Sequence, residues 1–168
     1  QRVDFAVLET GLGGRLDATN AVNALISVIT PISYEHTDKL GKSLKKIARE
    51  KAGIIKGRRS VVISAPQEKE ALDVIRARSD LLEAKFCVVN KFKSLEIRLL
   101  GRHQQINANV AVKAIKALSL YGFKIKNDSI RRGLFNTLWP GRCEVIRRNP
   151  YVVIDGAQNA ASARVLKE

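Results

Sequence analysis

The sequence contains no methionine, only two cysteines and few aromatic residues, which make up 5% of its 168 residues. Cys87 and Cys143 are too few for a disulfide scaffold, so we expect a reducing, cytoplasmic environment. The longest nearly apolar stretch, residues 24–32, is too short to cross a bilayer, and nothing at the N-terminus resembles a secretory signal. We therefore expect no membrane partner. Because the chain starts at Gln1 and has no start residue, we interpret it as a piece of a longer protein.

Basic residues dominate the charge and give a net charge of +14. This balance favours anionic partners such as phosphates or nucleotides, and it also fits an ordinary solvated basic surface. The positive residues are scattered along the chain, and the aromatic residues are too sparse for a surface that stacks bases. We therefore expect no nucleic-acid partner.

Short apolar runs alternate with helical patterns over most of the chain. The runs at residues 5–8, 25–29, 60–63 and 86–89 are typical of parallel strands buried on both faces. Helical spacing predicts helices that begin after Ser43 and over residues 67–82 and 107–121, and a last helix toward Asn136 capped by Asn127 or Asp128. The alternation predicts an α/β fold with a mainly parallel sheet.

A second domain is predicted to begin near residue 140. Residues 137–141 read as a linker, and the strand patterns 144–146 and 151–154 follow, with a helix starting at Ala160. We assign residues 1–139 to a first domain and residues 140–168 to the start of a second α/β domain.

Carboxylates follow two of the predicted strands, at Glu9 and at Asp155, where ligands gather in open α/β sheets. The glycine-rich residues 11–20 come directly after Glu9. They do not form a dinucleotide fingerprint, because Leu16 stands where a third glycine is needed. This run is either a flexible turn or a backbone that closely approaches a ligand. The two histidines, His36 and His103, lie in polar loops and are either surface residues or ligands.

Lys51 stands out because it shares a helical face with Leu44, Ile47 and Ala48. A lysine on an inner face is costly unless it reaches solvent, pairs with an acid or is chemically modified. The sequence leaves these alternatives open, together with a lysine held beside a metal or a phosphate.

Several segments together resemble the folylpolyglutamate synthase/dihydrofolate synthase family, the folate branch of the Mur ligases. The matching runs are residues 8–20 (LETGLGGRLDATN), 36–41, 47–56, 101–104 with Asn107 and Ala108, 139–142, and 155–157 with Asn159. The resemblance implies a Mur-ligase-type central ATPase domain in residues 1–139 and a Rossmann-like C-terminal domain that starts at residue 140.

The resemblance implies an ATP-dependent ligase that adds L-glutamate to a folate or dihydropteroate through an acyl phosphate. Glu9 and His36 would bind Mg²⁺, and Lys51 would be carbamylated beside the acyl phosphate. Lys51, His36 and Arg142 would serve catalysis. The nucleotide would contact Asn107, Arg142, Asp155 and Gln158. We expect the full-length enzyme to be a cytoplasmic monomer and this chain alone to be inactive.

The match also has departures. The family's phosphate loop is absent from the chain, and residues 90–101 are fewer than the family usually has there. Glu35 stands where the family usually has aspartate, Gln158 where it has histidine, and Ala160 where it has proline. Two alternative functions remain: another Mur-type ligase that acts on a cell-wall peptide, and a non-catalytic basic module that binds nucleotides or nucleic acid.

Overall fold

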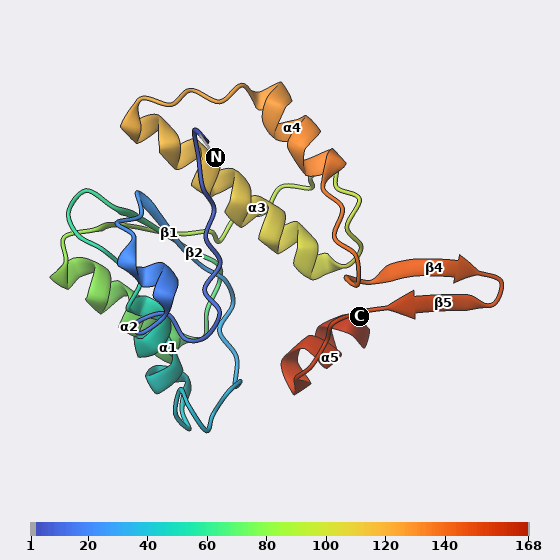
Figure 1. The fold of residues 1–168 in the computed structure, drawn as a ribbon, viewed down its shortest axis with the longest axis horizontal. Coiled ribbons are helices and arrows are strands. Elements are labelled where there is room, and N and C mark those ends of the chain that lie inside the picture. The colour runs from blue at the N-terminus through green and yellow to red at the C-terminus, as the bar shows by residue number, and fades with distance from the viewer. Residues whose placement is uncertain (1–2, 168) are drawn as a thin grey trace. The chain divides into compact units, whose positions relative to one another are not determined.

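The computed structural model describes residues 3–167 and contains two β-sheets in this part of the chain (Figure 1). The first sheet has the strand order β1-β2-β3, formed by Ile26–Ile29, Val61–Ser64 and Lys85–Val88. The second is an antiparallel pair, β4 (Glu144–Arg148) and β5 (Tyr151–Ile154). These five strands confirm five of the six strand predictions, and the fold is α/β as expected.

The strands of the larger sheet run parallel. The carbonyl oxygen of Ser60 accepts the N–H of Lys85 at 3.1 Å, and that of Ser64 accepts the N–H of Val89 at 2.9 Å. The two pairs advance together along both strands, which is the parallel register. All four residues of β2 are buried, as expected for a central strand covered on both faces.

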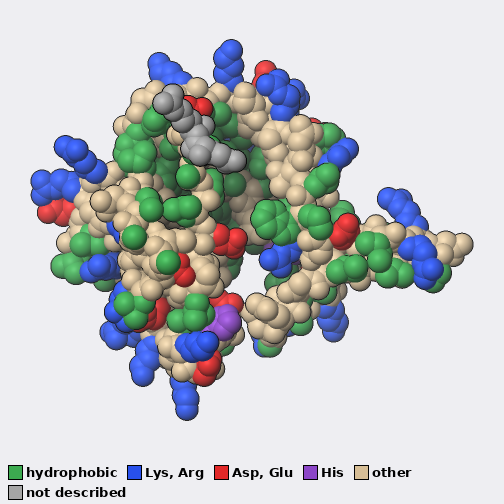
Figure 2. All heavy atoms as spheres, viewed as in Figure 1, with side chains coloured by type: hydrophobic (Ala, Val, Ile, Leu, Met, Phe, Trp, Pro, Cys, Tyr) green, Lys and Arg blue, Asp and Glu red, His purple; other side chains and the backbone are tan. Residues whose placement is uncertain are grey.

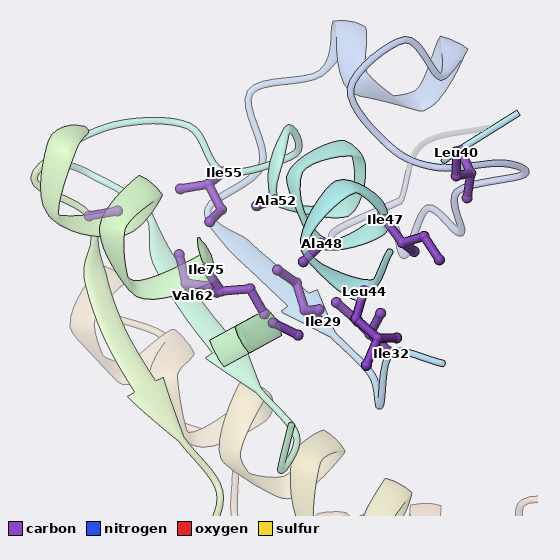
Figure 3. Close-up of a cluster of buried hydrophobic side chains, with 12 residues drawn as sticks. Ile29, Ile32, Leu40, Leu44, Ile47, Ala48, Ala52, Ile55, Val62 and Ile75 are labelled. Carbon is purple, nitrogen blue, oxygen red and sulfur yellow. The ribbon is translucent and has the colours of Figure 1, made fainter. Parts of the chain in front are cut away.

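Two helices cover the core of this sheet. Helix α1 (Leu44–Ala52) begins at the predicted cap, where the Ser43 hydroxyl accepts the N–H of Lys46 at 3.3 Å. Helix α2 spans Lys69–Leu81. Figure 3 shows side chains of both helices and of β1 and β2 converging on one apolar cluster. Ile47, Ala48 and Ile75 are 0% exposed there, which confirms the predicted inner face of α1.

The remaining helices are α3 (Arg102–Ala117), α4 (Asn127–Asn136) and α5 (Ala160–Lys167). Short 3₁₀ turns occupy Ala18–Ala21 and, directly after α3, Leu118–Tyr121. Helix α3 begins earlier than predicted, directly after Gly101, whose φ of +102° suits a residue without a side chain. The predicted cap of α4 is wrong, because Lys126 occupies the cap position and no side chain caps the helix.

The described chain divides into two compact units. The first contains the described residues up to Val62 and Gln67–Phe86, and the second contains Ile63–Pro66 and the described residues from Cys87 onward. The predicted domain ranges, 1–139 and 140–168, include residues 1, 2 and 168, which lie outside the described residues. The boundary between residues 139 and 140 stays a prediction.

Residues 5–8 do not form the predicted strand. They have no regular secondary structure, and Phe5, Val7 and Leu8 are 46%, 97% and 52% exposed. A strand buried on both faces needs a neighbouring strand and a covering layer, and no described strand pairs with these residues. Glu9 therefore does not stand at the end of a strand, which corrects the sequence-based placement.

Lysine and arginine side chains are dispersed over the face shown in Figure 2. Although the net charge is +14, the basic side chains on that face do not form one continuous stripe. Within residues 3–167, none of the helices has the length and apolar character needed to cross a bilayer.

Truncating the core should destabilise the protein far more than truncating its surface. Ile75→Ala should lower the free energy of unfolding by about 2–5 kcal/mol, because it leaves a cavity between α2 and the sheet. Leu81→Ala in the same helix removes a side chain that is 72% exposed and should cost about 0.5 kcal/mol or less. Urea denaturation of both variants measures the difference. Equal losses would contradict the placement of α2.

Candidate functional site

The loop from Gly11 to Asn20 is organised around the carboxylate of Asp17. Its Oδ2 accepts the backbone N–H groups of Gly11 at 3.0 Å and Leu12 at 3.1 Å. Its Oδ1 accepts the N–H of Thr19 at 2.9 Å and the Thr19 hydroxyl at 2.6 Å. These hydrogen bonds, led by the Thr19 hydroxyl, stabilise the charged form and lower the pKa of Asp17 to about 2. The loop is therefore a closed structure and not a flexible turn.

This loop lies against the C-terminal end of helix α1. The N–H of Arg15 donates to the carbonyl of Glu50 at 2.8 Å, and Arg15 Nε lies 3.1 Å from the Glu50 carboxylate. Gly14 has a φ of +152°, and a Cβ there would lie 3.0 Å from the Glu50 carbonyl oxygen and 3.1 Å from that of Lys51. Gly14 thus permits the loop backbone to approach α1 closely.

Asn20 links the loop to residues that follow the end of α1. Its Nδ2 donates to the carbonyl oxygens of Arg15 at 2.9 Å and Gly53 at 3.2 Å. The Lys56 ammonium donates to the carbonyl oxygen of Asn20 at 2.6 Å and to its Oδ1 at 2.7 Å. Asn20 therefore ties the end of the loop to Gly53 and Lys56, which follow α1.

The loop also lines a cavity of about 380 Å³. Lys39, Leu40 and Glu50 complete its lining. The predicted alternative, a backbone that closely approaches a ligand, therefore stays open on this side of the loop.

Lys51 pairs with an acid, one of the solutions expected for a lysine on this face. Its Nζ lies 2.9 Å from Oε1 of Glu35, and the two side chains are 25% and 28% exposed. Glu35 directly precedes His36, which is exposed and has a φ of +47°. The carbonyl oxygen of His36 accepts the N–H groups of Lys39 and Leu40 at 2.9 Å and 2.8 Å. The fold thus brings Lys51 to the turn that carries His36.

Glu9 forms no hydrogen bond or ion pair with Lys51, Glu35 or His36 in the described part of the chain. It is exposed in an irregular segment. The same residues contain no cluster of three or more His, Cys, Asp or Glu side chains that could hold a metal ion. The proposed metal ligands Glu9 and His36 stay predictions.

Arg142 and Asp155 flank the second sheet at the same end. Because β4 and β5 are antiparallel, with Glu144 opposite Ile154, the residues before β4 and after β5 meet. Asp155 accepts the N–H of Cys143 on Oδ2 and that of Ala157 on Oδ1, both at 2.7 Å.

Gly156 lies directly against this pair. Its N–H donates to the carbonyl of Gly141 at 2.9 Å, and a Cβ at Gly156 would lie 3.1 Å from Nη1 of Arg142. Asp155 therefore organises the turn that carries Arg142.

The other two predicted nucleotide residues are exposed. Asn107 lies in α3, and its Nδ2 donates to Oε1 of Gln104 at 3.1 Å. The backbone N–H of Gln158 donates to the Ser162 hydroxyl at 3.1 Å. The Gln158 side chain forms no hydrogen bond with the described residues.

Sequence reasoning missed three supporting residues. No role was predicted for Asp17, which is part of the matching run 8–20. An aspartate two residues before a threonine is nevertheless a pattern that caps turns. Glu35 was noted only as a departure. Gln104 stands three residues before Asn107, the spacing of neighbours on one helical face.

Comparisons with known proteins find relatives whose names are those of folate enzymes. No family model matches it. The dihydrofolate synthase/folylpolyglutamate synthase of Bacillus subtilis is 35% identical over 99% of this chain and 44% of its own length. The protein of the same name from Escherichia coli is 33% identical over 98% of this chain and 42% of its own length.

The solved structures that resemble this chain are also folylpolyglutamate synthases. The apo form of folylpolyglutamate synthase (FPGS) from L. casei matches with a TM-score of 0.88 and 31% identity, over 98% of this chain and 46% of that one. An FPGS–AMPPCP–folate complex matches with a TM-score of 0.89 and 29% identity, over 95% of this chain and 45% of that one. The chain thus spans less than half the length of these proteins.

Removing the charge of Asp17 should destabilise the loop. Because the pKa of Asp17 is lowered to about 2 from 3.8, its contribution to stability is present above pH 3.8 and lost as pH falls through about 2. Asp17→Asn should lower Tm at neutral pH, since the new amide would face the N–H groups of Gly11 and Leu12. The difference from wild type should shrink toward pH 2.

Thermal unfolding followed by circular dichroism between pH 7 and pH 2 checks this. Asp38→Asn, a change at an exposed aspartate in a neighbouring loop, is the matched control and should leave Tm unchanged. An equal Tm for Asp17→Asn and wild type at neutral pH would show that the carboxylate does not organise the loop.

Proposed function

Because this chain belongs to the folylpolyglutamate synthase/dihydrofolate synthase family of Mur ligases, we propose that it forms part of an ATP-dependent ligase that joins L-glutamate to a folate or dihydropteroate. The observation that carries the proposal is its likeness to the FPGS–AMPPCP–folate complex, at a TM-score of 0.89 over 95% of this chain. The activity is that of a longer protein, since the chain spans 44% of the Bacillus subtilis relative.

The reaction proceeds in two steps. The substrate carboxylate attacks the γ-phosphorus of ATP, which forms an acyl phosphate and releases ADP. The amine of L-glutamate then attacks the acyl carbon, loses a proton and expels inorganic phosphate, leaving an amide. Such phosphoryl transfers depend mainly on positioning and on neutralising charge.

Lys51, in its carbamylated form, supplies a negative charge at a fixed position near the acyl phosphate. Its neutral amine adds to CO₂ and loses a proton, which gives a carbamate anion. The 2.9 Å contact with Glu35 supports a site at this position, because it places the end of Lys51 beside a carboxylate and next to His36. A carbamate and a carboxylate so close together repel each other, an arrangement that favours a bound cation.

Glu9 and His36 would hold Mg²⁺. One carboxylate and one imidazole fit an ion that takes its remaining ligands from water and phosphate oxygens, although an imidazole is an unusual ligand for magnesium. When bound, the ion neutralises charge on the triphosphate. Of these two proposed ligands, only His36 is next to a residue that contacts Lys51, because Glu35 directly precedes it in the chain.

The nucleotide contacts Asn107, Arg142, Asp155 and Gln158. The Arg142 guanidinium neutralises phosphate charge, and Asp155 supports the turn that carries it through its bond to the N–H of Cys143. Asn107 offers a carboxamide oxygen that has no partner in the described residues. The full-length protein acts as a cytoplasmic monomer.

Replacing Lys51 should remove catalysis but not folding. In the full-length protein, Lys51→Ala should reduce folate- and glutamate-dependent ADP release by about 10²–10³-fold, as expected for loss of one electrostatic group at a reacting phosphate. The loss of unfolding free energy should be roughly 1 kcal/mol or less, because the pair with Glu35 is partly exposed.

Lys45→Ala is the matched control, since Lys45 is an exposed lysine of the same helix. Its ADP release should equal that of wild type. Unchanged turnover in Lys51→Ala would refute the role of Lys51, and a wild-type protein without folate-dependent ADP release would refute the proposed function.

A further inference from the structure

Hydrogen bonding continues past the end of strand β1 through a side chain. The strand ends at Ile29, and Pro31 has no N–H to donate. Gln67 binds the residues on either side of Pro31. The N–H of Ile32 donates to Gln67 Oε1 at 2.8 Å, and Gln67 Nε2 donates to the carbonyl oxygen of Thr30 at 2.8 Å. We call these two hydrogen bonds the Gln67 bridge.

The bridge has the pattern of a parallel strand pair. In such a pair, one residue accepts an N–H from, and donates its own N–H to a carbonyl of, the two residues that flank its partner. The carboxamide of Gln67 supplies one acceptor and one donor in the same way, and Pro31 is the flanked residue. Gln67 therefore replaces a strand residue opposite Pro31 and fixes the direction in which the chain leaves the sheet.

The bridge forms beside the apolar core. Ile32 is 6% exposed and lies in the cluster of Figure 3. An N–H left unpaired there would lose its hydrogen bonds with water without replacement, which is destabilising. Gln67 directly precedes Glu68, the cap residue of helix α2, so the bridge also ties the exit of β1 to the start of α2. The first compact unit thus determines where the segment after β1 begins.

The segment that begins at the bridge carries residues of the proposed site. Glu35 and His36 follow the bridge within a few residues, and the Glu35 carboxylate lies 2.9 Å from Lys51 Nζ. Residues 32–36 contain no helix or strand, so the contacts at the two ends of this short segment determine its path. One of these contacts is the Gln67 bridge, and the other is the ion pair with Lys51.

We propose that Gln67 is a positioning residue for the ligase reaction: it sets the path of residues 32–36, which holds Glu35 against Lys51 and places the turn that carries His36. This inference rests on the proposed function, in which Lys51 and His36 act near the transferred phosphate. Without the bridge the segment keeps only one of its two attachments. A small displacement of groups that act on a phosphate removes much of their effect, because this chemistry depends on positioning.

The split between kcat and KM in the full-length protein tests the proposal. Gln67→Met keeps the length of the side chain and removes its hydrogen bonds to Thr30 and Ile32. It should lower kcat for folate-dependent ADP release by about tenfold or more. KM for ATP should stay within about twofold of wild type, because the residues proposed to contact the nucleotide belong to other segments. An unchanged kcat would overturn the proposal.

Gln105→Met is the matched control. The Gln105 side chain also accepts a backbone N–H and donates to a backbone carbonyl, both of Leu95, at 2.9 Å and 2.8 Å. Like Gln67, it is half-buried. Its replacement should lower Tm, as that of Gln67 should, and leave kcat at the wild-type value. A fall in kcat as large as that of Gln67→Met would show that the loss of a structural hydrogen bond is sufficient and would contradict the proposal.

Hydrogen exchange in the full-length protein tests the bridge without turnover. In wild type the N–H of Ile32 should exchange as slowly as those of β1, and fast exchange there would overturn the bridge even if the variant fails to fold. In Gln67→Met, exchange should be faster at Ile32 and also at Lys39 and Leu40, whose N–H groups bond the carbonyl of His36. Unchanged exchange at Lys39 and Leu40 would overturn the positioning of this turn.

The two measurements separate the role of Gln67 from the proposed function. A wild-type protein that protects Ile32 but shows no folate-dependent ADP release would refute the proposed function. An active wild type together with a fully active Gln67→Met would refute the role of Gln67 and leave the proposed function standing.

Discussion

The carboxylate of Asp17 is the constraint on which the glycine-rich loop and its attachment to helix α1 depend. It gathers three backbone N–H groups and one hydroxyl, which closes the glycine-rich loop. The closed loop can then seat Gly14 and Arg15 against the carbonyl end of α1. Lys51 lies in that last turn of α1 and reaches Glu35 from it. The carboxylate of Asp17, in a surface loop, thereby helps to position Lys51, which is proposed to act near the acyl phosphate.

The second compact unit uses a similar device. Asp155 accepts N–H groups on both carboxylate oxygens and joins the residues before β4 to those after β5. Arg142 is held in the turn that results. In both units a carboxylate bound by backbone donors shapes a glycine-containing turn. In the first unit this turn packs against helix α1, which carries Lys51, and in the second unit the turn itself carries Arg142.

Much of the fold could be predicted from sequence, because apolar runs and caps act locally. β2 and α1 follow from a continuous apolar run and from a serine cap. Residues 5–8 show the limit: their pattern is that of a strand, but a strand needs a partner that no local pattern reveals. The site followed the same rule. Motif spacing selects Lys51 and Asp155 as candidates, and their roles stay predictions, whereas the contacts of these residues with Glu35 and Cys143 depend on tertiary packing and could not be predicted.

The central claim is that the Asp17 loop positions Lys51 through α1, and a double-mutant cycle in the full-length protein tests it most directly. The rate of folate-dependent ADP release would be measured for Asp17→Asn, Lys51→Ala and the double variant. The account predicts that the double variant is no slower than Lys51→Ala alone, because residues that act as a unit are not additive. Fully additive losses would show that the loop and the lysine act independently and would contradict the claim.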